Sequence, residues 1–91
     1  MRNILIAGNW KMNKTIAEAK EFAEAVKGCE LSKHTELAIL APFTQIAALK
    51  EALKDTDIKV GAQNVHHEPS GAYTGEVSVA MLKELGVDYC I

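Results

Sequence analysis

The chain has 91 residues, of which 48% are apolar and 24% are charged. This composition is typical of a small globular domain and excludes an intrinsically disordered segment. Ten basic and 12 acidic residues give a net charge of −2, with no basic cluster. We therefore expect no nucleic acid and no membrane among the partners, the more so because every apolar run is far shorter than the ~20 residues that span a bilayer.

Cysteine usage bears on the cellular compartment. Cys29 and Cys90 lie far apart, and neither belongs to a CxxC motif. This predicts neither a disulfide framework nor a zinc site and favours a reducing, cytoplasmic environment. The first residues after Met1 also lack the apolar region of a signal peptide.

The first predicted elements are a strand near 3–8 and a helix near 16–27. The strand is a continuous apolar run, which is typical of a strand buried on both faces. Thr15 and Glu18 have the spacing of a capping box, so the helix is expected to begin after Thr15. Gly28 could end it in the left-handed conformation.

The same alternation continues to the end of the chain. A strand near 37–41 is stopped by proline, and Thr44 could cap a helix near 45–54. A third strand is expected near 58–62. Ser78 and a closing glycine, Gly86, frame a helix near 79–85, followed by a fourth strand near 87–91.

The order βαβαβαβ predicts an α/β fold with a parallel sheet. The strands recur about every 28 residues, so eight units would need roughly 225 residues, close to the ~250 of an eight-fold βα barrel. Four strands of such a barrel leave one sheet face and two edges open, so we expect the N-terminal part of a longer fold or a piece that must assemble. A doubly wound sheet, with helices on both faces, is the alternative.

Chemistry in parallel α/β folds is concentrated beyond the carboxyl ends of the strands. After the first strand, Lys11 could reach a phosphate or a developing oxyanion, with the amide of Asn9 beside it. The loop matches neither a Walker motif nor GxGxxG. A solvated lysine in an ordinary loop is the other interpretation, and Trp10 is expected to be a scaffold aromatic under that loop.

The longest loop, residues 63–77, follows the third strand. Its polar residues and its aromatic suit a contact surface, since long loops in compact domains are usually functional or disordered. His66, His67 and Glu68 invite a metal-site hypothesis. Adjacent histidines rarely converge on one ion, so we expect solvated or interface histidines and no metal.

Several segments resemble the triosephosphate isomerase family. The run Ile6–Asn13 is similar to its first strand and loop, Gly61–Val65 with Gly71–Ser78 to its third strand and interface loop, and Leu85–Ile91 to the approach to its fourth strand. The likeness spans the whole chain in order. It implies the N-terminal part of a TIM (β/α)8 barrel.

The resemblance also implies an activity. The family interconverts dihydroxyacetone phosphate and glyceraldehyde 3-phosphate through an enediolate, in glycolysis and gluconeogenesis, as a cytosolic homodimer without cofactor or metal. A glutamate is the base and a neutral histidine polarises the carbonyl, and this family is itself the usual example of such tuning. Neither group falls within the matched segment, so the 91-residue piece alone is expected to be inactive.

The resemblance assigns roles to individual residues as well. Asn9 and Lys11 match the substrate-binding pair, with Lys11 also catalytic through stabilisation of negative charge. The family's subunit interface is matched at the base and tip of the long loop, at Gln63, Asn64, Tyr73, Thr74, Gly75 and Glu76. Two other hypotheses stay open: an inactive folding or interaction module, and a small doubly wound phosphate-binding domain that rests on Lys11.

Overall fold

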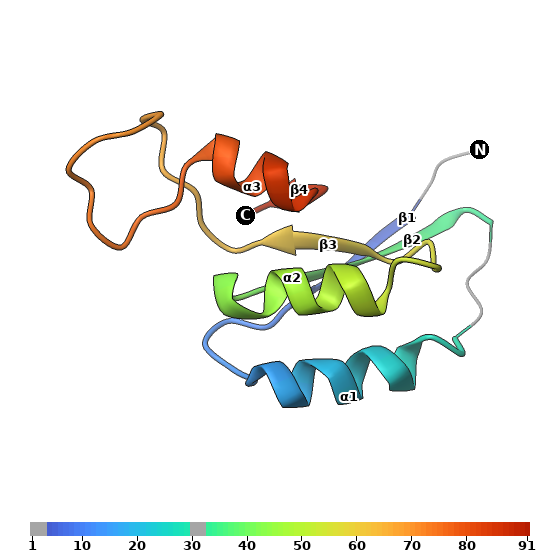
Figure 1. The fold of residues 1–91 in the computed structure, drawn as a ribbon. Helices are drawn as coiled ribbons and strands as arrows, with labels where there is room; N and C mark the ends of the chain where they lie inside the picture. Colours follow the sequence, from blue (N-terminus) through green and yellow to red (C-terminus); the bar gives the residue numbers. More distant parts are fainter. Residues whose placement is uncertain (1–3, 30–32) are drawn as a thin grey trace.

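Four parallel strands and three helices alternate through residues 4–29 and 33–91, the part of the chain that the computed structural model describes (Figure 1). The predicted start of the first strand at Asn3 lies outside these residues. The elements are β1 (Ile4–Asn9), α1 (Ile16–Val26), β2 (Thr35–Ala41), α2 (Phe43–Ala52), β3 (Lys59–Ala62), α3 (Val79–Leu85) and β4 (Tyr89–Cys90). No helix within these ranges has the length and apolar character needed to cross a bilayer.

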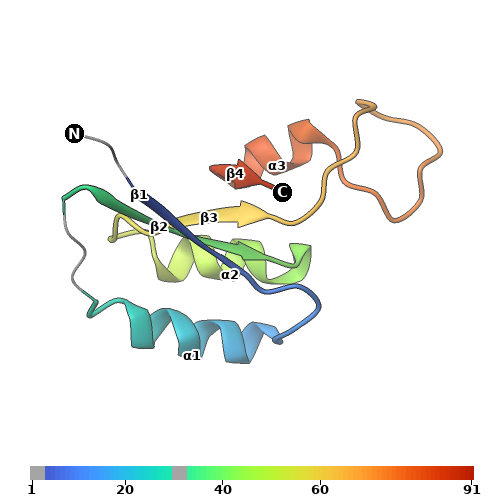
Figure 2. The same cartoon turned by 180° about the vertical axis from the view of Figure 1, so that it is seen from behind.

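The sheet has the order β1-β2-β3-β4, with every neighbouring pair parallel. Figures 1 and 2, which show opposite sides, place α1, α2 and α3 on one face of the sheet. Sequential strands with helices on a single face form part of a β/α barrel, because a doubly wound sheet carries helices on both faces. The predicted α/β fold class is confirmed, and the doubly wound alternative is wrong for the described residues.

The hydrophobic core lies between the sheet and its helices. Ile39 from β2 and Val60 from β3 are paired in register and buried against Ile46 and Leu49 of α2. These four are the largest fully buried side chains, and truncating such a residue to alanine typically costs ~2–5 kcal/mol. Ile46 and Leu49 thus lie on the packing face of α2.

Within residues 4–29 and 33–91, no helix lies on the opposite face of the sheet. Leu40, Gly61 and Tyr89 follow one another across it in register. A Cβ atom on Gly61 would lie 2.3 Å from Leu40 Cδ2 and 2.6 Å from the Tyr89 carbonyl oxygen, so a glycine permits this close approach. The Tyr89 hydroxyl reaches past β3 to donate to Glu36 Oε1, and this hydrogen bond raises the pKa of Tyr89.

The edge strand β1 is the least covered element of the sheet. Among the described strands it pairs with β2 alone, and Ile4, Leu5 and Ile6 are 57%, 49% and 53% exposed. An apolar edge strand of this kind is a template for pairing with further strands.

Local side-chain and backbone chemistry sets the starts of α1 and α3 and the end of α3. Thr15 Oγ1 accepts from the Glu18 backbone N–H, and Glu18 Oε1 accepts from the Thr15 backbone N–H, so the capping box is confirmed. The bond from the Thr15 backbone lowers the pKa of Glu18. Ser78 accepts from the Met81 N–H, and Gly86 ends α3 at φ 78°, as predicted.

Two predicted helix-end residues have other roles. Thr44 lies inside α2, which begins after Pro42, because Pro42 has no N–H to continue the ladder and the chain turns into the helix at once. Helix α1 ends at Lys27 in a right-handed conformation, so the left-handed cap predicted for Gly28 is wrong.

Element bounds also shift from the sequence prediction. Strand β2 begins at Thr35, two residues before the apolar run, because Thr35 and Glu36 still pair with Ile4 and Leu5 of β1. Strand β4 is confined to Tyr89–Cys90, since only the last two residues of the short β3 pair with it.

The two glycines that follow α1 and α3 provide a matched test of backbone conformation. Gly86→Ala forces an alanine into the left-handed region and should lower the free energy of unfolding by about 1 kcal/mol. Gly28 is not left-handed and has open space around it, so Gly28→Ala should leave stability unchanged or raise it by up to about 1 kcal/mol. Urea unfolding of the full-length protein, followed by circular dichroism at one protein concentration, measures the free energy of unfolding of both variants. Equal losses in the two variants would contradict this account of the helix ends.

Candidate functional site

The carboxyl ends of β1 and β3 bring three predicted site residues together. Asn9 is the last residue of β1, Lys11 follows two positions later, and Gln63 comes directly after β3. The Lys11 backbone N–H donates to Asn9 Oδ1 at 2.9 Å, and Gln63 Nε2 donates to the Lys11 carbonyl oxygen at 2.9 Å. The loops that leave β1 and β3 are therefore in direct contact.

Two polar donors in this cluster are unused. The Lys11 ammonium and the Asn9 side-chain NH₂ are exposed and have no hydrogen-bond or ion-pair partner within residues 4–29 and 33–91. Asn9 pairs in register with Leu40, which puts its side chain on the face of the sheet away from the helices. A cation and an amide donor two residues apart at a strand end suit an anionic oxygen ligand.

The β1–α1 loop, residues 10–15, has an unusual backbone. Lys11 and Lys14 are the non-glycine residues with positive φ in the described part of the chain, at 54° and 77°. Left-handed conformations cost L-residues ~1–2 kcal/mol, so the surroundings must hold them. Gln63 Nε2 donates to the Lys11 carbonyl, and Gln45 Nε2 donates to the Lys14 carbonyl.

Trp10, the first residue of this loop, packs against α1. It is 9% exposed and meets Phe22 of α1 edge to face, with ring centroids 5.2 Å apart at 85°. The Lys14 ammonium lies 5.6 Å from the Trp10 ring centroid and 5.9 Å from that of Phe22, within cation–π range. Trp10 is a scaffold aromatic, as predicted, and joins the loop to α1.

The β3–α3 loop, residues 63–78, extends away from the sheet (Figure 1). The Glu76 N–H donates to the Tyr73 carbonyl at 3.0 Å, and Gly75 has φ 90°, so Thr74 and Gly75 form an exposed turn at the tip. Asn64 Nδ2 lies 3.5 Å from Glu76 Oε2 and links the base of the loop to this turn. The predicted interface residues thus share one projecting loop, and their role in an interface stays a prediction.

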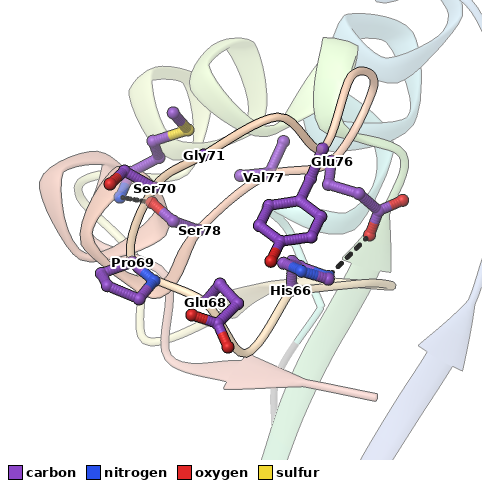
Figure 3. A pocket seen from close by; sticks show the side chains of 10 residues that line it. His66, Glu68, Pro69, Ser70, Gly71, Glu76, Val77 and Ser78 are labelled. Atoms are coloured by element: carbon purple, nitrogen blue, oxygen red, sulfur yellow. Dashed lines mark hydrogen bonds and ion pairs between the residues drawn. The ribbon is translucent and has the colours of Figure 1, made fainter.

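The interior of this loop holds a cavity of about 270 Å³ (Figure 3). His66 lies against the Tyr73 ring with centroids 4.2 Å apart, and its Nδ1 is 3.7 Å from Glu76 Oε2. His67 is largely exposed and lies 3.4 Å from Glu68. In the part of the chain that the structure describes, no three His, Cys, Asp or Glu side chains are grouped so that they could hold a metal ion.

Sequence reasoning missed Gln45. This residue of α2 is 2% exposed and holds the β1–α1 loop from a position 31 residues away from Lys14. Its Oε1 accepts from the Thr44 hydroxyl, so both ends of the amide are bonded. No local signal could have found it, because its acceptor, the Lys14 carbonyl, lies 31 residues away in sequence.

Comparisons with known proteins place the chain in a family. The family model described as triosephosphate isomerase matches residues 4–91. Proteins named triosephosphate isomerase from Finegoldia magna and Alkaliphilus metalliredigens are 52% and 50% identical over the whole chain, which covers 36% and 37% of their lengths. That of Acetivibrio thermocellus is 53% identical over 99% of the chain and 36% of its own length. The chain spans little more than a third of the curated relatives that it matches, and it belongs to the triosephosphate isomerase family.

Proposed function

We propose that this chain, as part of a full-length barrel, serves an isomerase that interconverts dihydroxyacetone phosphate and glyceraldehyde 3-phosphate. The observation that carries the proposal is the pair of unused donors, Asn9 Nδ2 and Lys11 Nζ, at the carboxyl end of β1. Family membership supports the reaction class. The reaction belongs to glycolysis and gluconeogenesis.

The proposed chemistry assigns distinct tasks to the two residues. Moving a proton between neighbouring carbons creates an enediolate, whose negative charge adds to that of the phosphate. The Lys11 cation stabilises this developing charge, and the Asn9 amide donates a hydrogen bond to the substrate. Fixed donors of this kind need no reorganisation as the charge develops, which is why they lower the barrier.

Further groups complete the proposed site. The family resemblance assigns the carbonyl-polarising histidine and the glutamate base to positions beyond the matched segment, with no cofactor. His66 and His67 belong to the β3–α3 loop and are not substitutes for that histidine. The 91-residue chain alone is therefore proposed to be inactive.

The same proposal includes a cytoplasmic homodimer. The exposed Thr74–Gly75 tip is suited to dock on a second subunit, close to that subunit's own β1–α1 loop. The two cysteines of the chain, Cys29 and Cys90, are free thiols, which agrees with a reducing compartment.

Replacing the site cation tests the proposal in the full-length protein. Lys11→Ala should lower kcat/KM for glyceraldehyde 3-phosphate by about 10²- to 10³-fold, the usual effect of removing one preorganised charge contact. Alanine has the same aversion to positive φ as lysine, so the loss reports the ammonium group. Lys20→Ala, on the exposed surface of α1, is the matched control and should stay within twofold. A near-parental kcat for Lys11→Ala would refute the assigned role.

The second candidate function is a catalytically inactive folding or interaction module, favoured by the exposed apolar edge strand β1. On either proposal the isolated 91-residue chain should self-associate or stay loosely packed, because no described helix covers one face of its sheet. Sedimentation velocity, thermal melting and a turnover assay measure this. A monodisperse monomer with a sharp cooperative melt, or measurable turnover by this chain, would contradict the expectation.

A further inference from the structure

Each of the two left-handed lysines in the β1–α1 loop is held by a glutamine from a distant part of the chain. Gln63 is 52 residues from Lys11 in sequence, and Gln45 is 31 residues from Lys14. In both cases a side-chain amide donates to the carbonyl of the residue with positive φ. A backbone in a sparsely populated conformation persists only when its surroundings fix it.

The two glutamines differ in how fully they are bonded. Gln45 is buried, its Nε2 donates to the Lys14 carbonyl, and its Oε1 accepts from Thr44. Gln63 uses only its Nε2, because its Oε1 is buried without a partner within residues 4–29 and 33–91. Within one chain, Gln63 therefore acts on the β1–α1 loop through its donor alone.

The direction of the Gln63 amide is fixed by the same contacts. Turning it over would place Oε1 against the Lys11 carbonyl oxygen and leave the NH₂ group without its acceptor. The residue therefore has one productive orientation, with its donor on the backbone of the site lysine. That backbone is held from its other side by Asn9, whose Oδ1 accepts from the Lys11 N–H.

We propose that Gln63 is a positioning residue, whose Nε2 donor holds the Lys11 carbonyl and so fixes Lys11 in the left-handed conformation that aims its ammonium at the anionic substrate. This inference rests on the proposed function for its catalytic consequence. Its structural consequence, the φ of Lys11, is independent of any activity. The role differs from the interface role that family resemblance gives to Gln63, because it acts within one chain.

The full-length protein with Gln63→Met tests the proposal. Methionine keeps the shape of glutamine but removes both the donor and the unsatisfied oxygen. We expect kcat/KM to fall about tenfold, mostly in kcat, while the urea midpoint stays unchanged or rises. Thr56→Val, which removes a hydroxyl-to-carbonyl hydrogen bond at the opposite end of the sheet, is the control and should keep kcat/KM within twofold.

A double-mutant cycle separates positioning from a general structural effect. In a Lys11→Ala background, Gln63→Met should change kcat/KM by less than twofold, since no ammonium is left to aim. An undiminished tenfold loss in that background, or a loss below twofold in the parent, overturns the proposal. If Gln63→Met does not fold, Gln63→Leu, which is also uncharged and lacks the donor, replaces it, with the same outcomes expected.

A crystal structure of the Gln63 variant provides the readout that does not depend on turnover. Lys11 should leave φ 54° for a right-handed or extended conformation. A Lys11 backbone that stays left-handed without the glutamine overturns the positioning role. A parent protein without isomerase turnover would refute the proposed function, while the Lys11 backbone in the variant would still decide the positioning role.

Discussion

Parallel pairing of the strands in chain order is the constraint on which the candidate site depends. It places the carboxyl ends of all four strands at one edge of the sheet, and the register aligns Asn9, Leu40 and Gly61 in one row. The loops leaving β1 and β3 therefore meet, and a hydrogen bond joins residues 52 positions apart in sequence. Without that alignment, the Gln63 amide could not reach the Lys11 carbonyl.

The β1–α1 and β3–α3 loops at this edge differ in how they contact the rest of the chain. The β1–α1 loop is fixed by the packing of Trp10 against α1 and by hydrogen bonds to the side-chain amides of Asn9, Gln45 and Gln63. Contacts of this kind can hold a charged group in a fixed position before a ligand binds, which is the preorganisation that electrostatic stabilisation requires. The β3–α3 loop projects from the sheet and ends in the exposed Thr74–Gly75 turn, which suits contact with another surface.

Local sequence signals predicted much of the fold. The Thr15–Glu18 capping box, the Ser78 cap and the Gly86 terminus each depend on residues within a few positions of one another, so the chemistry is readable from the chain. The prediction for Gly28 failed because a glycine permits the left-handed conformation without requiring it. The prediction that Thr44 caps α2 failed because the helix already begins after Pro42, two residues earlier.

The candidate site was only partly predictable. The position of Lys11 at a strand end follows from periodicity and the rule for parallel sheets. The left-handed backbone of Lys11 and Lys14, and the glutamines that hold it, depend on contacts between residues more than 30 positions apart. No local pattern encodes such contacts, and Gln45 looks in sequence like any polar residue of a helix.

We propose that the Lys11 ammonium meets an anionic oxygen of a small sugar phosphate. A crystal structure of the full-length protein with bound dihydroxyacetone phosphate tests it most directly. The account predicts Lys11 Nζ at about 2.7–2.9 Å from a phosphate or carbonyl oxygen of the ligand, the usual length of a charge-assisted hydrogen bond. A ligand bound elsewhere, with Lys11 directed into solvent, would contradict it.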